Sequence, residues 1–187
     1  MGKAINSLGV ALLVKAYVKA TTDVSIDPDK IYYVKKTISS TDYYVVSDGS
    51  ETTLANLYEI VASTTASAIN AWVQPVCLTD VPEIGGQPSM LETTTLCDPQ
   101  KTYIQGVMDA GESLEFGANY VHSAFVAIKS HLEGNTYPCK VVFGGIGGDQ
   151  GSFSFNGQVS ARVGSFGVDE VIPMTISVAI ASEITYA

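Results

Sequence analysis

The sequence predicts a mainly β protein of the α+β class, an antiparallel β-sandwich or barrel with one flanking α-helix. Between residues 152 and 163 the apolar side chains occupy every second position, which is typical of a strand with one buried face. Over residues 120–132 they recur at helical spacing instead, and Gly134 follows as a stop signal. No Ser/Pro/Gly-rich linker divides the 187 residues, so we expect a single domain over 1–187.

Further strands are predicted at both ends of the chain. Apolar residues alternate from Gly9 to Ala20, which predicts a long first strand. Residues 31–36 and 42–47 are rich in Tyr and Val and predict a β-hairpin. Near the C-terminus, residues 172–180 alternate again, and we expect them to pair with 152–163 through the connection at 164–167.

Residues 20–71 are expected to form a long loop or hairpin insertion. Within it, Asp48 and Glu51 resemble a capping box, and the apolar residues that follow have helical spacing, which predicts a second helix up to Val61. The insertion has two possible roles: an extended loop between stacked rings of a larger assembly, or an outward decoration.

A Pro- and Gly-rich segment follows residue 80 and predicts a loop of fixed shape, since proline sets φ and glycine permits positive φ. A strand-like run, Leu91 to Leu96, comes next, and a second one covers residues 101–106. The loop residues that we single out as a candidate structural and assembly element are Pro82, Glu83, Ile84, Gly85, Gly86 and Pro88.

This order of loop, Glu-x-Thr-x-Leu strand, Thr-Tyr-Ile-x-Gly strand and helix resembles the tail tube (major tail) proteins of long-tailed bacteriophages, over roughly residues 72–181. The resemblance implies a structural virion protein of the phage tail, made in the host cytoplasm. Six copies would close into a hexameric ring with a shared β-barrel, and stacked rings would form the tube that conducts DNA during ejection. The helix would pack outside that barrel, and residues 81–90 would reach between subunits or rings. Implied partners are further copies of the chain, a tape-measure protein, a tail terminator and a distal tail protein.

The charge balance fits passage of DNA better than its recognition. Ten basic residues stand against 19 acidic ones, a net charge of −9, and Arg162 is the single arginine of the sequence. Sequence-specific binding of nucleic acid is therefore disfavoured. Under the resemblance, an acidic lumen would keep transient, non-specific DNA from sticking to the tube wall. Apolar residues make up 46% of the chain and charged ones 16%, which hints at apolar surface buried against partners.

No pattern in the sequence predicts catalysis, a metal site or a cofactor. The glycines of residues 144–151 precede a strand and lack the Gly-Lys-Ser/Thr of a phosphate loop. His122 and His131 are nine residues apart on the predicted helix, which places them on opposite faces. The acids Asp109, Glu112 and Glu115 fit a solvated turn better than a glycosidase pair. The three cysteines are interpreted as small buried hydrophobic residues: Cys77, Cys97 and Cys139.

We also expect no signal peptide and no membrane span, because the apolar run from Leu8 to Val14 is short. Three alternatives to a phage tail tube stay open. One is the inner tube of a contractile tail or of a secretion apparatus. Another is a monomeric β-sandwich binding module that uses Trp72 and several tyrosines. An enzyme is the third and the weakest, for want of a catalytic constellation.

Overall fold

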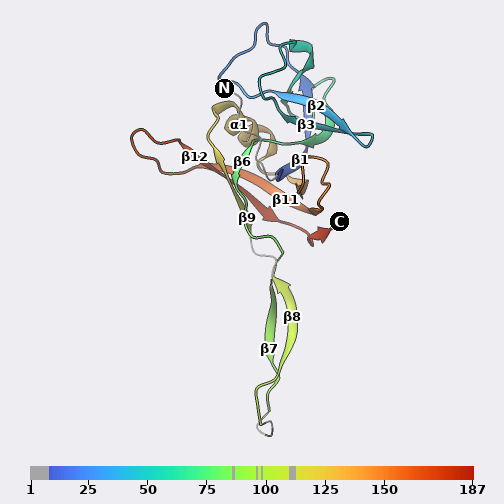
Figure 1. The fold of residues 1–187 in the computed structure, drawn as a ribbon, viewed down its shortest axis with the longest axis vertical. Coiled ribbons are helices and arrows are strands. Elements are labelled where there is room, and N and C mark those ends of the chain that lie inside the picture. The colour runs from blue at the N-terminus through green and yellow to red at the C-terminus, as the bar shows by residue number, and fades with distance from the viewer. Residues whose placement is uncertain (1–8, 86, 96, 98, 110–112) are drawn as a thin grey trace.

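The computed structural model describes residues 9–85, 87–95, 97, 99–109 and 113–187. Figure 1 shows a body of strands with a closed barrel at one end and a two-stranded arm that extends away from the other end. The described residues contain one short α-helix, and the remaining elements are almost all strands. The predicted class, a mainly β protein with one flanking helix, is confirmed; the ring assembly stays a prediction.

Five strands close the barrel: β1 (Ala11–Ala20), β2 (Tyr33–Ile38), β3 (Thr41–Val46), β4 (Leu57–Ile60) and β5 (Ile69–Val73). Neighbours around it are β1, β5, β3, β2 and β4, and β4 returns to the end of β1. All pairs are antiparallel except β3 with β5. The predicted first strand and the predicted hairpin are therefore both present.

The first half of β1 continues the barrel into an open antiparallel sheet. Next to β1 come β10 (Thr136–Val142), β11 (Ser152–Val163), β12 (Pro173–Ile180), β9 (Ser113–Asn119) and β6 (Leu78–Asp80). A last short strand, β13 (Thr185–Tyr186), pairs with the start of β11. The predicted pairing of residues 152–163 with 172–180 is confirmed, with Val159 opposite Val178.

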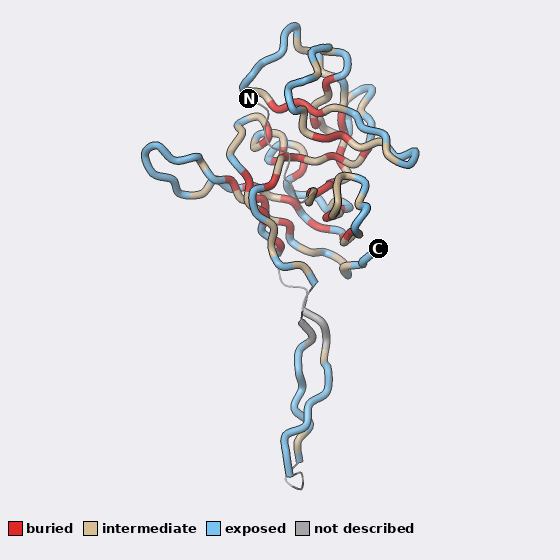
Figure 2. The backbone as a smooth tube through the Cα atoms, in the orientation of Figure 1, coloured by how far each residue is buried: buried red, intermediate tan, exposed pale blue. Residues whose placement is uncertain are grey.

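One side of this sheet is covered by helix α1 (His122–Ala127), which continues as a π-helical turn, η2 (Ile128–Leu132). The buried helix residues Ala124, Ile128 and Leu132 pack into the main core with inward-facing strand residues such as Phe116. This confirms the helix predicted over 120–132. Figure 2 shows the buried residues gathered in the body, whereas most arm residues whose burial is described are exposed.

A smaller apolar cluster lies on the opposite side of the sheet. Ala11, Leu13 and Val142 are buried there, and Tyr43, Trp72 and Ile146 pack on them. Alternate residues of β1 therefore face different clusters, because neighbouring side chains of a strand point to opposite sides.

The second predicted helix is wrong. Residues 54–56 form a short 3-10 turn, η1 (Leu54–Asn56), and Leu57 begins strand β4. Glu51 does not close a capping box, because its carboxylate accepts hydrogen bonds from the Thr53 N–H (2.7 Å) and the Asn56 side chain (3.1 Å). Pairing of β4 with β1 and β2 buries Leu57 and Ile60, and these non-local contacts override the local pattern. Residues 20–71 thus supply three whole barrel strands and the start of β5 rather than only a loop or hairpin insertion.

The arm is a sheet of its own, made of β7 (Gln87–Glu92) and β8 (Tyr103–Asp109). The strand expected over 91–96 begins earlier, at Gln87, and ends at Glu92, while Leu96 lies outside the described residues. Beyond Glu92 one more backbone hydrogen bond joins the two sides of the arm, from the Thr93 N–H to the Thr102 carbonyl (2.9 Å). Most of the turn predicted at 109–112 also lies outside the described residues.

Candidate functional site: the assembly surfaces

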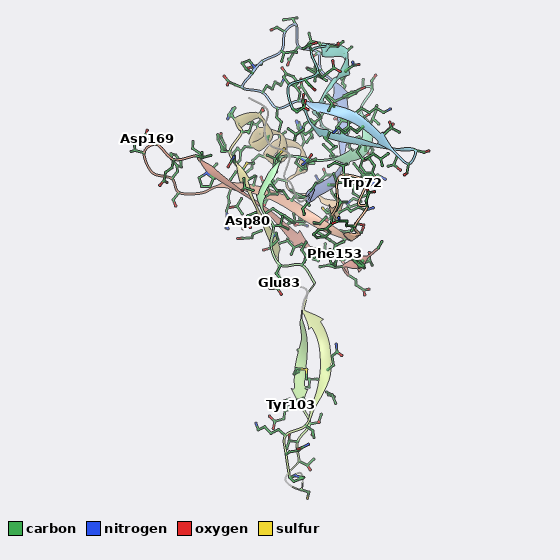
Figure 3. The ribbon with its side chains drawn as sticks, in the orientation of Figure 1. Trp72, Asp80, Glu83, Tyr103, Phe153 and Asp169 are labelled. Carbon is green, nitrogen blue, oxygen red and sulfur yellow. The ribbon has the colours of Figure 1, made fainter. Side chains whose placement is uncertain are left out.

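The loop singled out from the sequence forms the root of the arm. Residues 82–85 connect β6 to β7 (Figure 3), and Gly85 has a φ of +122°, a conformation that favours glycine. Ile84 is half-buried and packs against the main core, whereas Glu83 is exposed. Gly86 and the side chain of Pro88 lie outside what the structure describes. The described loop residues thus anchor the arm to the body.

The arm exposes apolar side chains on an unsupported two-stranded sheet. Met90 and Leu91 on β7 are 62% and 53% exposed, and Ile104 on β8 is 54% exposed. Tyr103, labelled in Figure 3, lies opposite Glu92 and is 48% exposed. A lone hairpin is marginally stable in water, and in the described structure no third strand supports β7 and β8. The sequence predicted the two strands of the arm, but it did not indicate that they form a sheet of their own apart from the body.

Over β9, β11 and β12 the sheet face opposite the helix is polar and nearly free of charge, whereas Lys140 of β10 lies beside it, opposite Ser154. Across β11, β12 and β9 the register places Ser160 opposite Ser177, and Ser177 opposite Glu115. Glu115 is paired with Arg162, whose Nη2 lies 2.8 Å from its Oε1. Other residues that these strands direct to this face include Asn156, Gln158, Thr175, Ala179 and Ser113. The face therefore offers hydroxyl and amide groups rather than a field of one sign.

Strand β9 also has an open edge. Its other side is fully paired with β12, but β6 covers only Gly117 and Ala118. In the described part of the chain, no strand pairs with this edge of Ser113–Phe116. Unpaired backbone groups on a strand edge favour addition of a strand from another chain.

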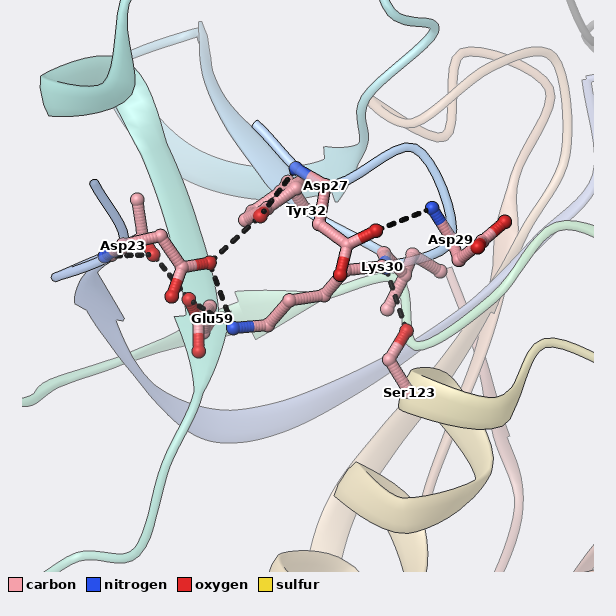
Figure 4. Close-up of polar contacts among 9 residues, drawn as sticks. Asp23, Asp27, Asp29, Lys30, Tyr32, Glu59 and Ser123 are labelled. Atoms are coloured by element: carbon pink, nitrogen blue, oxygen red, sulfur yellow. Dashed lines mark hydrogen bonds and ion pairs between the residues drawn. The ribbon is translucent and has the colours of Figure 1, made fainter. Parts of the chain in front are cut away.

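A polar cluster fixes residues 21–32 against the barrel and the helix (Figure 4). Lys30 Nζ lies 2.9 Å from both Asp23 Oδ2 and Glu59 Oε1, and the Tyr32 hydroxyl donates to Asp23 at 2.7 Å. The Ile31 N–H donates to Ser123 Oγ of helix α1 at 2.6 Å. These contacts join the segment to β4 and to the helix, so its shape is set by three elements.

The charges of this cluster shift each other's proton affinities. Hydrogen bonds from Lys30 and Tyr32 hold the pKa of Asp23 below its usual 3.8. Burial acts to lower the pKa of Lys30, but hydrogen bonds to Glu59 and Asp23 outweigh it and raise the pKa above 10.5. Burial raises the pKa of Tyr32. All three groups therefore keep their neutral-pH charge states, and the cluster is structural in character.

The histidines lie closer than the sequence indicated. Both line a cavity of about 420 Å³ beside Lys30 and Glu59, because the helix changes to π geometry at Ile128 and no longer turns 100° per residue. His122 Nδ1 lies 3.0 Å from the Tyr120 hydroxyl, and the buried His131 Nδ1 has no hydrogen-bond partner in the described structure. No group of three or more His, Cys, Asp or Glu among the described residues is placed to hold a metal ion.

The remaining candidates also fall into structural positions. Glu115 is on β9 and Asp109 ends β8, while Glu112 lies outside the described residues. The glycine-rich segment joins β10 to β11 as a tight connection, with Phe143 N–H bonded to the Gly151 carbonyl at 3.0 Å. Of the cysteines, Cys139 is buried, which raises its thiol pKa to about 12, Cys77 is half-buried and Cys97 is exposed near the end of the arm. The interpretation as buried residues is therefore confirmed for Cys139 and wrong for Cys97, and Cys77 is only half-buried.

The fold defines the class of the protein as mainly β, with a closed five-strand barrel continued by an open sheet. A scan against models of known protein families finds no match, and no curated protein matches the sequence. Within the described ranges, no helix has the length and apolar character needed to cross a membrane.

Proposed function

We propose that the chain is a structural virion protein that polymerises into stacked hexameric rings and forms the tail tube of a long-tailed phage, the conduit for DNA during ejection. The observation that carries this proposal is the arm of β7 and β8. It extends from the body with its apolar residues Met90, Leu91 and Ile104 in solvent, and a surface of this kind gains stability when it is buried against another copy.

The open edge of β9 and the polar sheet face support the ring. Residues 113–116 of β9 are available to a strand of the next copy, so that sheets from several copies join into one barrel. Helix α1 covers one side of the sheet, which leaves the polar face around Ser160 and Ser177 to line the conduit. The arm then spans from one ring to a neighbouring ring.

The polar face changes the expected role of charge in the conduit. Along the described parts of β9, β11 and β12, Glu115 is the acid on this face and Arg162 neutralises it. Over these strands a lining of hydroxyl and amide groups gives phosphate few fixed cations to bind, and Lys140 of β10 borders it opposite Ser154. DNA therefore passes because the lining offers little attraction, and the excess of acidic residues lies elsewhere on the protein.

The further partners in this proposal are a tape-measure protein inside the tube during assembly, and a tail terminator and a distal tail protein at its two ends. DNA passes transiently, and the protein is located in the virion tail. The proposal includes no catalytic step and no cofactor. An inner tube of a contractile tail or secretion apparatus shares this architecture, and a sheath partner distinguishes it.

The test compares the full chain with a variant in which residues 87–109 are replaced by a short Gly-Ser linker. We expect the concentrated full chain to form rings or hollow tubes of uniform width in negative-stain electron microscopy. The linker variant is expected to keep the circular dichroism of a folded body and to form no tubes. Tubes from the linker variant would contradict the role of the arm. A full chain that stays monomeric, even with a candidate tape-measure or tail-tip protein, would contradict the proposal and favour a binding module.

A further inference from the structure

The connection between β11 and β12, residues 164–172, protrudes from the body with apolar and acidic side chains in solvent (Figure 1). Phe166 is 55% exposed and Val168 is 93% exposed. Asp169 and Glu170 follow, and the Glu170 carboxylate accepts a hydrogen bond from the Gly167 N–H at 2.8 Å. We call residues 164–172 the tip. It combines a bent shape held by this bond with apolar residues and two negative charges.

A complementary surface lies on the outer side of the barrel. The strand registers place Lys36 opposite Tyr43, Tyr43 opposite Trp72, and Trp72 opposite Lys15, in one row across four strands. Lys15 Nζ lies 6.0 Å and Lys140 Nζ lies 5.4 Å from the centre of the Trp72 ring. We call these five residues the basic face. It consists of two aromatic rings bordered by three ammonium groups.

Among the described residues, the lysines of the basic face form no close ion pair, although Lys36 acts at longer range on Asp48. The ion pairs found among the described residues use Lys30, Lys35, Lys101, Lys129 and Arg162. Lys15, Lys36 and Lys140 take part in none of them. In a protein with a net charge of −9, lysines without close acid partners beside the half-buried rings of Tyr43 and Trp72 form a surface that attracts an acidic, partly apolar segment.

The tip and the basic face cannot meet within one chain. Figure 3 shows Asp169 and Trp72 on opposite sides of the body. Two different surfaces that complement each other on opposite sides of one subunit produce a head-to-tail contact, which closes into a ring when the rotation between copies permits. We propose that the tip of one copy docks on the basic face of the next copy. This inference rests on the proposed ring and names the surfaces that hold its neighbours together.

Charge reversal on each side, alone and combined, tests this contact. The face variant is Lys15→Glu with Lys140→Glu, and the tip variant is Asp169→Lys with Glu170→Lys. Each variant places like charges in the contact, and we expect the concentration needed for assembly to rise at least about tenfold. The chain with all four substitutions, and an equimolar mixture of the two variants, again pair opposite charges and should assemble near the wild-type concentration. Light scattering and sedimentation velocity measure the assembled mass.

A pair of valine substitutions provides a matched control for the apolar part. Val168 on the tip is 93% exposed and Val24 in another loop is 96% exposed, so Val168→Ser and Val24→Ser make the same chemical change in equal exposure. We expect Val168→Ser to weaken assembly and Val24→Ser to leave it unchanged. Equal effects of the two valine substitutions on assembly would overturn the contact. It would also be overturned if the chain with all four charge reversals assembled no better than the chains with two.

The outcomes separate this inference from the proposed function. Tubes that form in every variant would leave the tail tube standing and reject the tip contact. Charge-dependent open chains or small oligomers without rings would keep the contact and reject the tube. A face variant that loses binding to duplex DNA, while the tip variant assembles as wild type, would reassign the basic face to nucleic acid and reject the proposal.

Discussion

Lys30 Nζ lies 2.9 Å from Glu59 Oε1, although 29 residues separate them in the chain. The contact joins the segment that enters the barrel to strand β4, which closes it. Asp23 shares the same ammonium group at 2.9 Å. One cation therefore holds two parts of residues 20–71 together.

Substitution of Lys30 by Met should loosen residues 21–32. The change leaves two carboxylates without their cation, and we expect a loss in the free energy of unfolding on the order of 1 kcal/mol, since the pairs are partly exposed. Amide hydrogen exchange should be faster at residues 23–32. Lys101→Met is the matched control, because its pair with Glu92 is mostly exposed on the arm; an equal effect of the two substitutions would contradict the role of the cluster.

Acid should weaken the same cluster. The pKa of Asp23 lies below its usual 3.8 in the folded chain, so the unfolded chain takes up this proton first as the pH falls. The stabilisation is present above about pH 4 and is lost as the pH falls through the lowered pKa. The raised pKa of Lys30 acts only in the alkaline range, where deprotonation removes its contribution. Melting temperature measured from pH 7 to pH 3 should fall more for the wild type than for Lys30→Met; parallel curves would reject this assignment.

The turn between β2 and β3 should accept a stabilising substitution. Ser39 and Ser40 have φ values of 48° and 65°, and two positive φ angles at a two-residue hairpin turn are best supplied by Asn-Gly. Ser39→Asn with Ser40→Gly should raise the free energy of unfolding by roughly 0.5–1 kcal/mol. The double alanine variant should be less stable than wild type in urea titrations, and a reversed order would show that turn conformation does not limit stability here.

Deletion of residues 26–46 should unfold the protein rather than release a folded monomer. The deletion removes β2 and β3 from the closed barrel, together with the fully buried side chains of Tyr33 and Tyr44. Circular dichroism and one-dimensional proton NMR should show loss of the native fold. A dispersed spectrum would mean that the open sheet folds without the barrel.

Thiol labelling should distinguish the cysteines. Cys97 is exposed, whereas Cys139 is buried and its pKa is raised to about 12, so little thiolate is present at neutral pH. A maleimide should label Cys97 within minutes in the native protein and Cys139 only after denaturation. Peptide mass spectrometry measures both sites, and rapid native labelling of Cys139 would contradict its burial.

The sequence by itself determined the elements with a strong local signature. Residues 152–163 alternate so regularly that the strand bounds follow from the pattern, and residues 120–132 repeat at helical spacing over three turns. The hairpin around Ser39 also follows from local composition. The capping-box signal at Asp48 and Glu51 misled, because a local pattern says nothing of the strands that compete for the same backbone groups.

Tertiary structure alone decided which distant segments meet. Val18 pairs with Ile60 to close the barrel, and Tyr43 pairs with Trp72 in parallel; neither register follows from the spacing of residues along the chain. The arm, the open edge of β9 and the row from Lys36 to Lys15 exist only once those pairings are made. The physical reason is that strand pairing is a non-local choice, made by the combined burial of many side chains, whereas periodicity reports one strand at a time.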